Sequence, residues 1–376
     1  MSIPSLKDAK NLTGKRVLLR LDLNIPLEGG APRDDSRIEG ILPTISFLKN
    51  AGVAEIVIIS HHSDAEQSLE PIARFLAQKI SNRFIPDMSD EVAFWKVRAE
   101  GHSVFVCENL RFSRGEEEND EVFAARLAAL GDVYVNEAFS ASHRAHASIV
   151  RLPALLPSYA GFLFMHEVEE LSSAFTPEHP FLMVLGGAKP ETKIPLIHAF
   201  LPQVDSVFIG GAVANNFFHA LNFEIGSSRL DPVSSDLTKI LDSGKVILPE
   251  DVVVKNDEGV FVKSAEELSP GDMMLDIGPR AGEKLKELAR AARFIVWNAP
   301  LGDYEKAGFE KASIAFAEAV RESSALSIVG GGDTVALLRT HGLLDAFDFV
   351  SSGGGAMLQF LLKKTLPGIE ALKNSM

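Results

Sequence analysis

The stretch RVLLRLDLNIPLEGGAPRDDSRIEGILPTISFLKNAGVAEIVIIS, residues 16–60, decides the fold. It opens with one apolar run, RVLLRLDL, and closes with another, EIVIIS. Apolar residues between the two runs recur at helical spacing: Ile38, Ile41, Leu42, Ile45 and Leu48. Gly52 then provides a stop signal for that helix. A strand, a helix and a second strand in this order predict one βαβ unit of a parallel sheet.

The same order of elements recurs in both halves of the chain. In the first half, SVFVCEN (103–109) and DVYVNEA (132–138) flank a segment with Phe123, Leu127 and Leu130 at helical spacing. In the second half, six apolar runs are expected to be strands, most of them ending in glycine: PFLMVLGG, SVFIGG, KVILP, RFIVWN, LSIVGGG and FDFVSSGGG. We therefore predict an α/β fold of two doubly wound, Rossmann-like parallel-sheet domains.

Length and local sequence place a domain boundary near the middle. A chain of 376 residues exceeds what one hydrophobic core usually organises. The segment GFLFMHEVEELSSAF (161–175) predicts a single helix, and a break from Pro177 to Pro180 follows it. We expect this helix to be a hinge between an N-terminal domain, residues 1–162, and a C-terminal domain, residues 163–362, that includes the helix.

Composition excludes several classes of protein. A net charge of −14 opposes nucleic-acid binding, and an anionic ligand must then be held by a local cluster of arginine and lysine. No apolar stretch approaches the roughly 20 residues of a membrane span, and the N-terminus does not resemble a secretory signal. The single cysteine, Cys107, lies in an apolar run and predicts a buried, unreactive thiol. We expect a cytoplasmic protein that binds neither membrane nor nucleic acid.

Polar and basic residues follow the strands of the first half, where open α/β sheets bind their ligands. The candidates are Asp22, Asn24, His61, His62, Asn109, Arg111, Asn136, Glu137 and Arg144. Arg37 joins them if Ser36 caps the following helix. The arginines suit bidentate binding of phosphate or carboxylate. Such residues also serve as helix caps, turn formers or surface charges, and that alternative stays open for each of them taken singly.

Glycine-rich runs follow the strands of the second half. They are GGAK (186–189), GGA (210–212), GGGDT (330–334) and GGGA (353–356). Glycine allows backbone N–H groups to approach an anion closely, so four such runs favour a nucleotide with its phosphates. Neither GxxxxGK[ST] nor GxGxxG is present, which disfavours a Walker-type NTPase and a Rossmann dehydrogenase.

Three charged residues accompany these glycines. Lys189 and Lys193 flank the start of the helix after GGAK, where a lysine can neutralise a migrating phosphoryl group. Asp333 follows three glycines and suits Mg²⁺ that is carried on a nucleotide, because magnesium usually takes one or two carboxylates together with phosphate oxygens. The alternatives are a helix cap for Asp333 and solvated surface charges for the lysines.

Taken together, these residues resemble one family. From about residue 14 to 372, the sequence is similar in order and spacing to phosphoglycerate kinases, through the strings RLDLNIPL, DDSRI, ENLRF, GDVYVNEAFSASHRAHAS, LGGAK, IGGAVAN, LDIGP, WNAPLGDYE, SIVGGGDT, SSGGGA and LPGIEAL. The resemblance implies reversible phosphoryl transfer between 1,3-bisphosphoglycerate with ADP and 3-phosphoglycerate with ATP, in glycolysis and gluconeogenesis. It also implies that the N-terminal domain binds 3-phosphoglycerate, that the C-terminal domain binds MgADP or MgATP, and that the tail, residues 363–376, packs back on the N-terminal domain.

The resemblance also assigns roles to individual residues. On the acid side it places Asp22 and Asn24 at the hydroxyl and carboxylate end, His61, Arg111 and Arg144 around the phosphate, and Arg37 on the transferring group. On the nucleotide side it places Lys189 on the phosphoryl in flight, Lys193 and Asn298 on phosphates, Glu305 on the ribose, and Asp333 with Thr334 on Mg²⁺ and phosphates. The adenine and phosphate walls would be Gly210, Gly211, Gly331, Gly332 and Gly354.

Some positions depart from the family pattern. The family commonly has SHLGRP after the second strand, whereas this chain has Ser60, His61, His62, Ser63 and Asp64, so a carboxylate replaces a phosphate-binding arginine. Candidates to compensate are Arg33, Arg114 and His62, and the sequence does not choose among them. Thr192, Ala299, Ser140 and Ala141 are milder departures.

The chemistry agrees with this assignment. A carboxylate nucleophile with an ordinary pKa near about 4 is already ionised at neutral pH, so catalysis reduces to positioning and charge neutralisation. Arg37 and Lys189 are the expected catalytic cations, and a monomer is expected. Two rivals remain: a kinase for another small acid, suggested by Asp64, and a non-catalytic relative that binds nucleotide or a protein.

Overall fold

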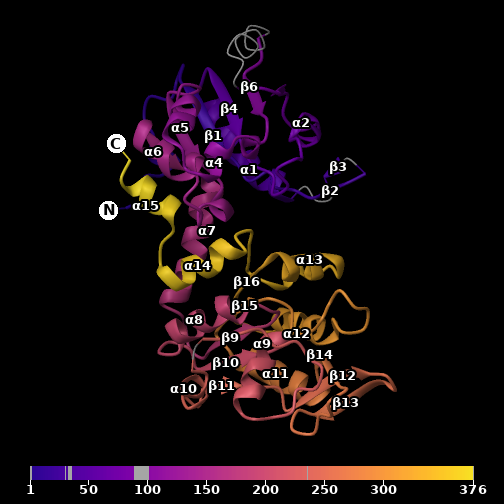
Figure 1. The fold of residues 1–376 in the computed structure, drawn as a ribbon. Helices are drawn as coiled ribbons and strands as arrows, with labels where there is room; N and C mark the ends of the chain where they lie inside the picture. Colours follow the sequence, from indigo (N-terminus) through magenta and orange to yellow (C-terminus); the bar gives the residue numbers. More distant parts are fainter. Residues whose placement is uncertain (1, 30, 33–35, 89–100, 235, 376) are drawn as a thin grey trace. The chain divides into compact units, whose positions relative to one another are not determined.

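The computed structural model describes residues 2–29, 31–32, 36–88, 101–234 and 236–375. The chain divides into two compact units, one formed by Met1–Glu169 with Thr365–Met376 and the other by Glu170–Lys364 (Figure 1). Each unit contains a parallel sheet of six strands with helices packed around it. The predicted α/β fold with two doubly wound sheets is thereby confirmed.

The sheet of the first unit has the strand order β5-β6-β4-β1-β7-β8, and every neighbouring pair is parallel. Its strands are β1 (Arg16–Arg20), β4 (Glu55–Ile59), β5 (Arg83–Ile85), β6 (Val104–Cys107), β7 (Val133–Asn136) and β8 (Ser158–Ala160). A two-stranded ribbon, β2 (Leu27–Glu28) with β3 (Ala31–Pro32), lies outside the sheet. The strands β1 and β4 confirm the βαβ unit predicted from residues 16–60.

The helix of that unit is α1 (Ser36–Asn50), and its predicted apolar face is buried at Ile38, Ile41, Ile45 and Leu48. The capping role predicted for the Ser36 side chain lies outside the described residues. The other α-helices among the described residues of this unit are α2 (Glu70–Leu76), α4 (Arg114–Glu117), α5 (Glu121–Ala128), α6 (Leu152–Leu155) and α15 (Pro367–Lys373). The same residues include short 3-10 helices, Leu6–Asp8, Leu110–Phe112 and Phe139–Ala141, and a π-helix, Ala147–Arg151.

Helix α7 (Phe162–Ser172), which is followed by the 3-10 helix Ser173–Phe175, is the single helix predicted over 161–175. The second sheet has the order β11-β10-β9-β15-β16-β17 and is also wholly parallel. Its strands match the six predicted apolar runs: β9 (Phe181–Leu185), β10 (Ser206–Ile209), β11 (Val246–Ile247), β15 (Phe294–Asn298), β16 (Leu326–Gly330) and β17 (Phe349–Ser351).

The helices of the second unit are α8 (Pro190–Phe200), α9 (Gly211–Ala220), α10 (Thr238–Leu241), α11 (Pro279–Ala291), α12 (Lys311–Glu322), α13 (Gly332–Thr340), α14 (Gly355–Lys363) and the 3-10 helix Leu344–Ala346. This unit also contains an antiparallel sheet that the sequence did not predict. Its order is β13 (Gly259–Ser264), β12 (Asp251–Asn256) and β14 (Met273–Ile277). Val260, Phe261 and Val262 of β13 are exposed, so burial gives this strand no clear pattern.

Two further expectations concern the cysteine and membrane-spanning helices. Cys107 is fully buried, which confirms the predicted burial, and burial raises the pKa of its thiol to about 12, which disfavours the reactive thiolate. Among the helices that the structure describes, none combines the length and apolar character needed to cross a membrane.

Candidate active site

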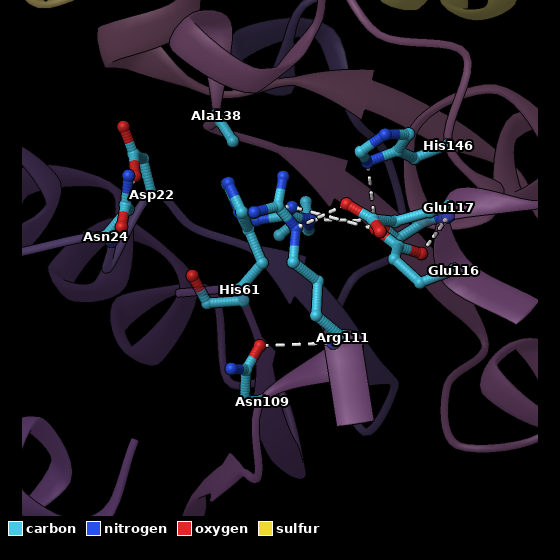
Figure 2. A network of polar contacts seen from close by, with 12 residues as sticks. Asp22, Asn24, His61, Asn109, Arg111, Glu116, Glu117, Ala138 and His146 are labelled. Atoms are coloured by element: carbon cyan, nitrogen blue, oxygen red, sulfur yellow. Dashed lines mark hydrogen bonds and ion pairs between the residues drawn. The ribbon is translucent and has the colours of Figure 1, made fainter. Parts of the chain in front are cut away.

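The predicted acid-binding residues lie at one edge of the first sheet. Parallel strands end at the same edge, so the residues that follow β1, β4, β6 and β7 are brought near one another. Figure 2 shows His61, Asn109 and Arg111 together, with Asp22 and Asn24 on one side and Glu116, Glu117 and His146 on the other.

Asp22 is held by a cation and a hydroxyl. Its Oδ2 accepts hydrogen bonds from Arg37 Nη1 and from Ser140 Oγ, and its Oδ1 accepts one from the Asn24 backbone N–H at 3.0 Å. Burial opposes the charged form, but the attraction of Arg37 and the hydrogen bonds from Ser140 and from the Asn24 backbone hold the pKa of Asp22 below its ordinary value. Arg37 also donates to the Asn24 carbonyl oxygen at 3.2 Å. The structure thus joins Asp22, Asn24 and Arg37.

His61 follows β4 and is only 5% exposed. Its Nδ1 lies 3.0 Å from Nη2 of Arg20. Burial first, and then the positive charge of Arg20, lower the pKa of His61 to about 2. The imidazole is therefore neutral at physiological pH.

The Asn109 side chain organises the loop after β4. The Asn109 amide accepts from the backbone N–H groups of His62 and Arg111, at 3.0 Å and 3.1 Å. It donates to the carbonyl oxygens of Asp64 and Gln67, at 3.2 Å and 3.0 Å. The interpretation of Asn109 as a turn former therefore accounts for its contacts in this structure.

Arg111 keeps part of its guanidinium available. Its Nη1 donates to the Ser63 carbonyl oxygen at 3.1 Å, and its Nε lies 3.0 Å from Glu117 Oε1. This contact is an ion pair and not a hydrogen bond. Arg111 Nε has no hydrogen-bond partner among the described residues. Arg111 thus combines a fixed position with unused donor capacity, which suits an anion.

Arg144 lies in the loop after β7. Its Nε donates to His143 Nε2 at 3.3 Å, and the other nitrogen of that ring contacts the Ser140 carbonyl oxygen at 2.8 Å. Because the charge of Arg144 helps to lower the pKa of both Arg111 and His61, the three basic residues act on one another electrostatically.

The residues that depart from the family pattern also have defined places. The Asp64 carboxylate accepts from the Glu66 backbone N–H at 2.9 Å, so it closes a local turn. His62 Nδ1 accepts from the Asp64 N–H at 3.2 Å, and Arg114 lies exposed at the start of α4. Arg33 lies outside the described residues.

The sequence reasoning missed a buried network behind this site. Arg20, Glu116 and Ser148 are all fully buried, and Arg20 Nε donates to Ser148 Oγ at 2.8 Å. Glu116 accepts from the Ser148 hydroxyl at 2.6 Å. The signal that could have revealed it is an arginine within the apolar run RVLLR, where a charge is buried only if it is paired.

In the second unit, glycines let two loops approach each other. A side chain at Gly211, where φ is +58°, would place its Cβ 2.4 Å from the Gly187 nitrogen. At Gly186 the added Cβ would lie 2.0 Å from the Pro300 carbonyl oxygen. Both positions therefore need glycine, and the GGAK and GGA runs are close-packed turns around the start of α9.

A cavity of about 490 Å³ lies beside these turns. Three predicted nucleotide residues line it: Gly211, Glu305 and Asp333. The sequence missed its apolar wall, which includes Phe218, Met273, Leu275, Ile277 and Leu301. Such a wall suits a flat aromatic base, whereas the glycines offer backbone N–H groups to phosphates.

The remaining predicted nucleotide residues lie at strand ends of the second sheet. Lys189 is exposed at a left-handed backbone position before α8, while Lys193 is 7% exposed within α8. Burial, followed by the charge of Lys189, lowers the pKa of Lys193, although Asp333 opposes that shift. Gly210 precedes α9, Gly331 precedes α13, Gly332 begins α13, and Gly354 precedes α14.

Asn298 and Thr334 hold the end of β15 to the end of β16. Asn298 Nδ2 donates to the Gly330 carbonyl oxygen at 2.8 Å, and Thr334 Oγ1 accepts from the Ala299 backbone N–H at 3.0 Å. Asn298 Oδ1 is buried and lacks a hydrogen-bond partner among the described residues. This amide oxygen can accept a hydrogen bond from a hydroxyl group of a bound ligand or from a water molecule.

Asp333 is compatible with a magnesium ion that arrives with a nucleotide. Its carboxylate is exposed in the first turn of α13, lines the cavity, and receives a hydrogen bond of 3.3 Å from the Tyr304 hydroxyl. The helix cap is Gly331, so the alternative role of Asp333 as the N-cap is wrong. The described residues contain no cluster of three or more His, Cys, Asp or Glu side chains that could hold a metal unaided. One carboxylate completed by phosphate oxygens is a usual magnesium arrangement.

Two doubly wound sheets, one with arginines at its strand ends and one beside a cavity with glycines in its lining, are compatible with the class of nucleotide-dependent phosphotransferases. The family model for phosphoglycerate kinase matches residues 6–364. The chain therefore belongs to the phosphoglycerate kinase family. This confirms the predicted activity, a phosphoryl transfer with a carboxyl group as acceptor, and its place in glycolysis.

Individual relatives give the same result. Phosphoglycerate kinases of a Chelativorans species and of Methylorubrum extorquens are 40% and 41% identical, and each match covers 98% of both chains. The solved structure of phosphoglycerate kinase from Coxiella burnetii is 35% identical with a TM-score of 0.83, over 99% of this chain and 98% of that one. The corresponding structure from Pyrococcus horikoshii OT3 is 31% identical with a TM-score of 0.85 and the same coverage.

Proposed function

We propose that the strand-end cluster of the first unit binds 3-phosphoglycerate and that the cavity of the second unit binds ADP or ATP. The observation that carries the proposal is the concentration of Arg37, Arg111, Arg144 and neutral His61 at one sheet edge in a protein of net charge −14. An acidic protein repels an anionic acid elsewhere on its surface, so this cluster is where such an acid is stabilised. Residues 1–162 with the tail 363–376 form the acid-binding domain in this proposal, and residues 163–362 form the nucleotide-binding domain.

Within the first domain, Asp22 and Asn24 bind the hydroxyl and carboxylate end of the acid. Arg111, Arg144 and His61 bind its phosphate. Arg37 neutralises the transferring group, for which it must exchange its present partner Asp22 for the substrate. Because the acceptor carboxylate is already ionised, no general base is required.

Within the second domain, Lys189 follows the phosphoryl group, and its exposed position before α8 leaves its ammonium free to do so. Lys193, Asn298, Thr334 and the glycines Gly210, Gly211, Gly331, Gly332 and Gly354 surround the nucleotide, with Glu305 on the ribose. Asp333 would hold Mg²⁺ on the nucleotide phosphates, where the ion supplies charge neutralisation. We further propose that the protein acts as a cytoplasmic monomer.

A coupled assay of 1,3-bisphosphoglycerate formation from ATP and 3-phosphoglycerate, with and without Mg²⁺, tests the proposal. Saturable, magnesium-dependent turnover is expected. A substrate panel separates the rival of another small acid, which predicts saturation with that acid and none with 3-phosphoglycerate. Binding of MgADP without any phosphoryl transfer would instead support the non-catalytic alternative.

A further inference from the structure

The buried network behind the acid site ends on a residue that the proposed function uses, His61. Arg20 is the last residue of β1 and is 0% exposed. Its guanidinium donates through Nε to Ser148 Oγ at 2.8 Å, through Nη1 to the Leu21 carbonyl oxygen, and through Nη2 toward His61 Nδ1 at 3.0 Å. Each of its three nitrogens thus has a separate partner.

The charge of Arg20 is balanced within the same network. Glu116, also 0% exposed, lies with Oε1 3.9 Å from Arg20 Nη2. Its two oxygens accept from the Ser148 hydroxyl at 2.6 Å and from the Ser148 backbone N–H at 2.9 Å. The Tyr134 hydroxyl donates to the Ser148 carbonyl oxygen at 2.7 Å. A buried ion pair with this many hydrogen bonds fixes the position of the guanidinium.

The chemistry of the contact decides the state of His61. A guanidinium carries only donors, so His61 Nδ1 must accept, and the single proton of the neutral ring must then lie on Nε2. We propose that Arg20 is a positioning residue: it holds His61 in the neutral tautomer with its proton on Nε2, so that His61 serves as a fixed donor to the anionic acid. This inference rests on the proposed function of the acid site.

The surrounding charges support a neutral ring. Arg20 from β1, Arg111 after β6 and Arg144 after β7 all oppose protonation, whereas Asp22 favours it. Burial is the largest effect and also opposes protonation. In this proposal His61 can therefore donate a hydrogen bond from Nε2 to the acid at every pH between 5.5 and 8.

Long-range ¹H–¹⁵N NMR of the uniformly labelled full chain tests the tautomer without any substrate. Comparison with His61→Gln assigns the ring among the 10 histidines. We expect an unprotonated Nδ1 and a protonated Nε2, both unchanged from pH 5.5 to 8. A proton on Nδ1, or titration near the ordinary pKa of about 6.5, would overturn the proposal. A failure of the proposed function would appear only in the turnover assay, so the two failures are distinguishable.

A variant then tests the role of Arg20. In Arg20→Gln the donor-only guanidinium is replaced by an amide that can either donate to His61 Nδ1 or accept from it, so part of the His61 population should carry its proton on Nδ1. The KM of this variant for 3-phosphoglycerate should then exceed that of the wild type at nearly constant kcat, and Arg20→Lys, which again offers only donors, should restore the single tautomer. Arg16→Gln, on the same strand but paired with Asp132 at the surface, is the matched control and should leave both readings unchanged. A His61 ring that keeps its proton entirely on Nε2 in folded Arg20→Gln would contradict the proposal. If that variant does not fold, the NMR measurement on the wild type still decides.

Discussion

The two units have similar parallel sheets, but different chemical groups form their proposed sites. In the first unit, side chains form the site: Asp22 is held by Arg37 and Ser140, and His61 by Arg20. In the second unit, the backbone dominates, because Gly186 and Gly211 leave no room for a side chain and the cavity has an apolar wall. The same type of parallel sheet therefore supports either a site that recognises charge or a site that recognises shape. The residues that follow its strands decide which.

This difference has a physical reason. A small, highly charged acid offers little apolar surface, so fixed charges and donors must recognise it. A nucleotide offers a flat base and a chain of phosphates, which apolar walls and backbone N–H groups accommodate. The comparison predicts that charge removal damages the first site most and that backbone crowding damages the second.

The largest effect is expected for the two cations proposed to be catalytic, Arg37 and Lys189. Arg37→Ala or Lys189→Ala should each lower kcat by about 10²- to 10³-fold, on the order of 3 kcal/mol in the transition state, because a charge that faces the migrating phosphoryl group is lost. Steady-state kinetics of ATP formation measure this, and circular dichroism checks that the fold is retained. Arg74→Ala on α2, whose side chain is 73% exposed, is the control and should turn over normally. Near-normal turnover in either cation variant would refute the assigned role.

Backbone crowding should have the next largest effect. Gly211→Ala places a Cβ against Gly187 at a positive φ, so the affinity for MgADP should fall at least about tenfold and the melting temperature should drop. Calorimetric titration measures the affinity. Gly282→Ala in α11 is the matched control, since an added Cβ there meets nothing within 4 Å. Equal MgADP affinity in the two variants would show that the glycine turns do not shape the nucleotide site.

A smaller effect is expected for the hydroxyl that binds Asp22. Ser140→Ala removes one hydrogen bond to a charged group, so the pKa of Asp22 should rise and KM for 3-phosphoglycerate should increase about fivefold at nearly constant kcat. The conservative variant Ser140→Thr keeps the hydroxyl and should stay close to the wild type. If alanine and threonine behave alike, the hydroxyl is not what positions Asp22.

The smallest effect is expected for a surface ion pair remote from the site residues. The hydrogen bond from Arg16, more than the opposing burial, lowers the pKa of Asp132 to about 2. Because this pKa is depressed, the pair stabilises the fold above the ordinary pKa of about 4 and loses that contribution as pH falls toward 2. After allowance for solvent screening, Asp132→Asn should lower the unfolding free energy by about 1 kcal/mol at pH 7.

Urea denaturation at pH 7 and near pH 2 measures this contribution, with Asp257→Asn in the turn after β12 as the control. The difference between Asp132→Asn and the wild type should become much smaller at the lower pH. A difference of unchanged size there would mean that packing, and not ionisation, explains the effect.

Strands with continuous apolar runs were predictable because buried parallel strands need apolar residues on both faces, as at Val104–Cys107 and Phe181–Leu185. Short edge strands such as Arg83–Ile85 have no such signal. The polar residues after the strands were predictable in kind and place. Their partners were not, because the contacts of Arg20 with Ser148 or of Asp22 with Ser140 join residues more than 100 positions apart. The apolar wall of the cavity was missed because Met273 and Leu275 lie in the unpredicted antiparallel sheet.

A crossed calorimetric titration tests the division into two differently built sites most directly. The variants Arg144→Ala and Gly211→Ala are each titrated with 3-phosphoglycerate and, separately, with MgADP. We predict that Arg144→Ala loses most of its affinity for the acid and keeps that for MgADP, and that Gly211→Ala shows the reverse. Loss of both ligands in one folded variant, or of the wrong ligand in either, would contradict the account.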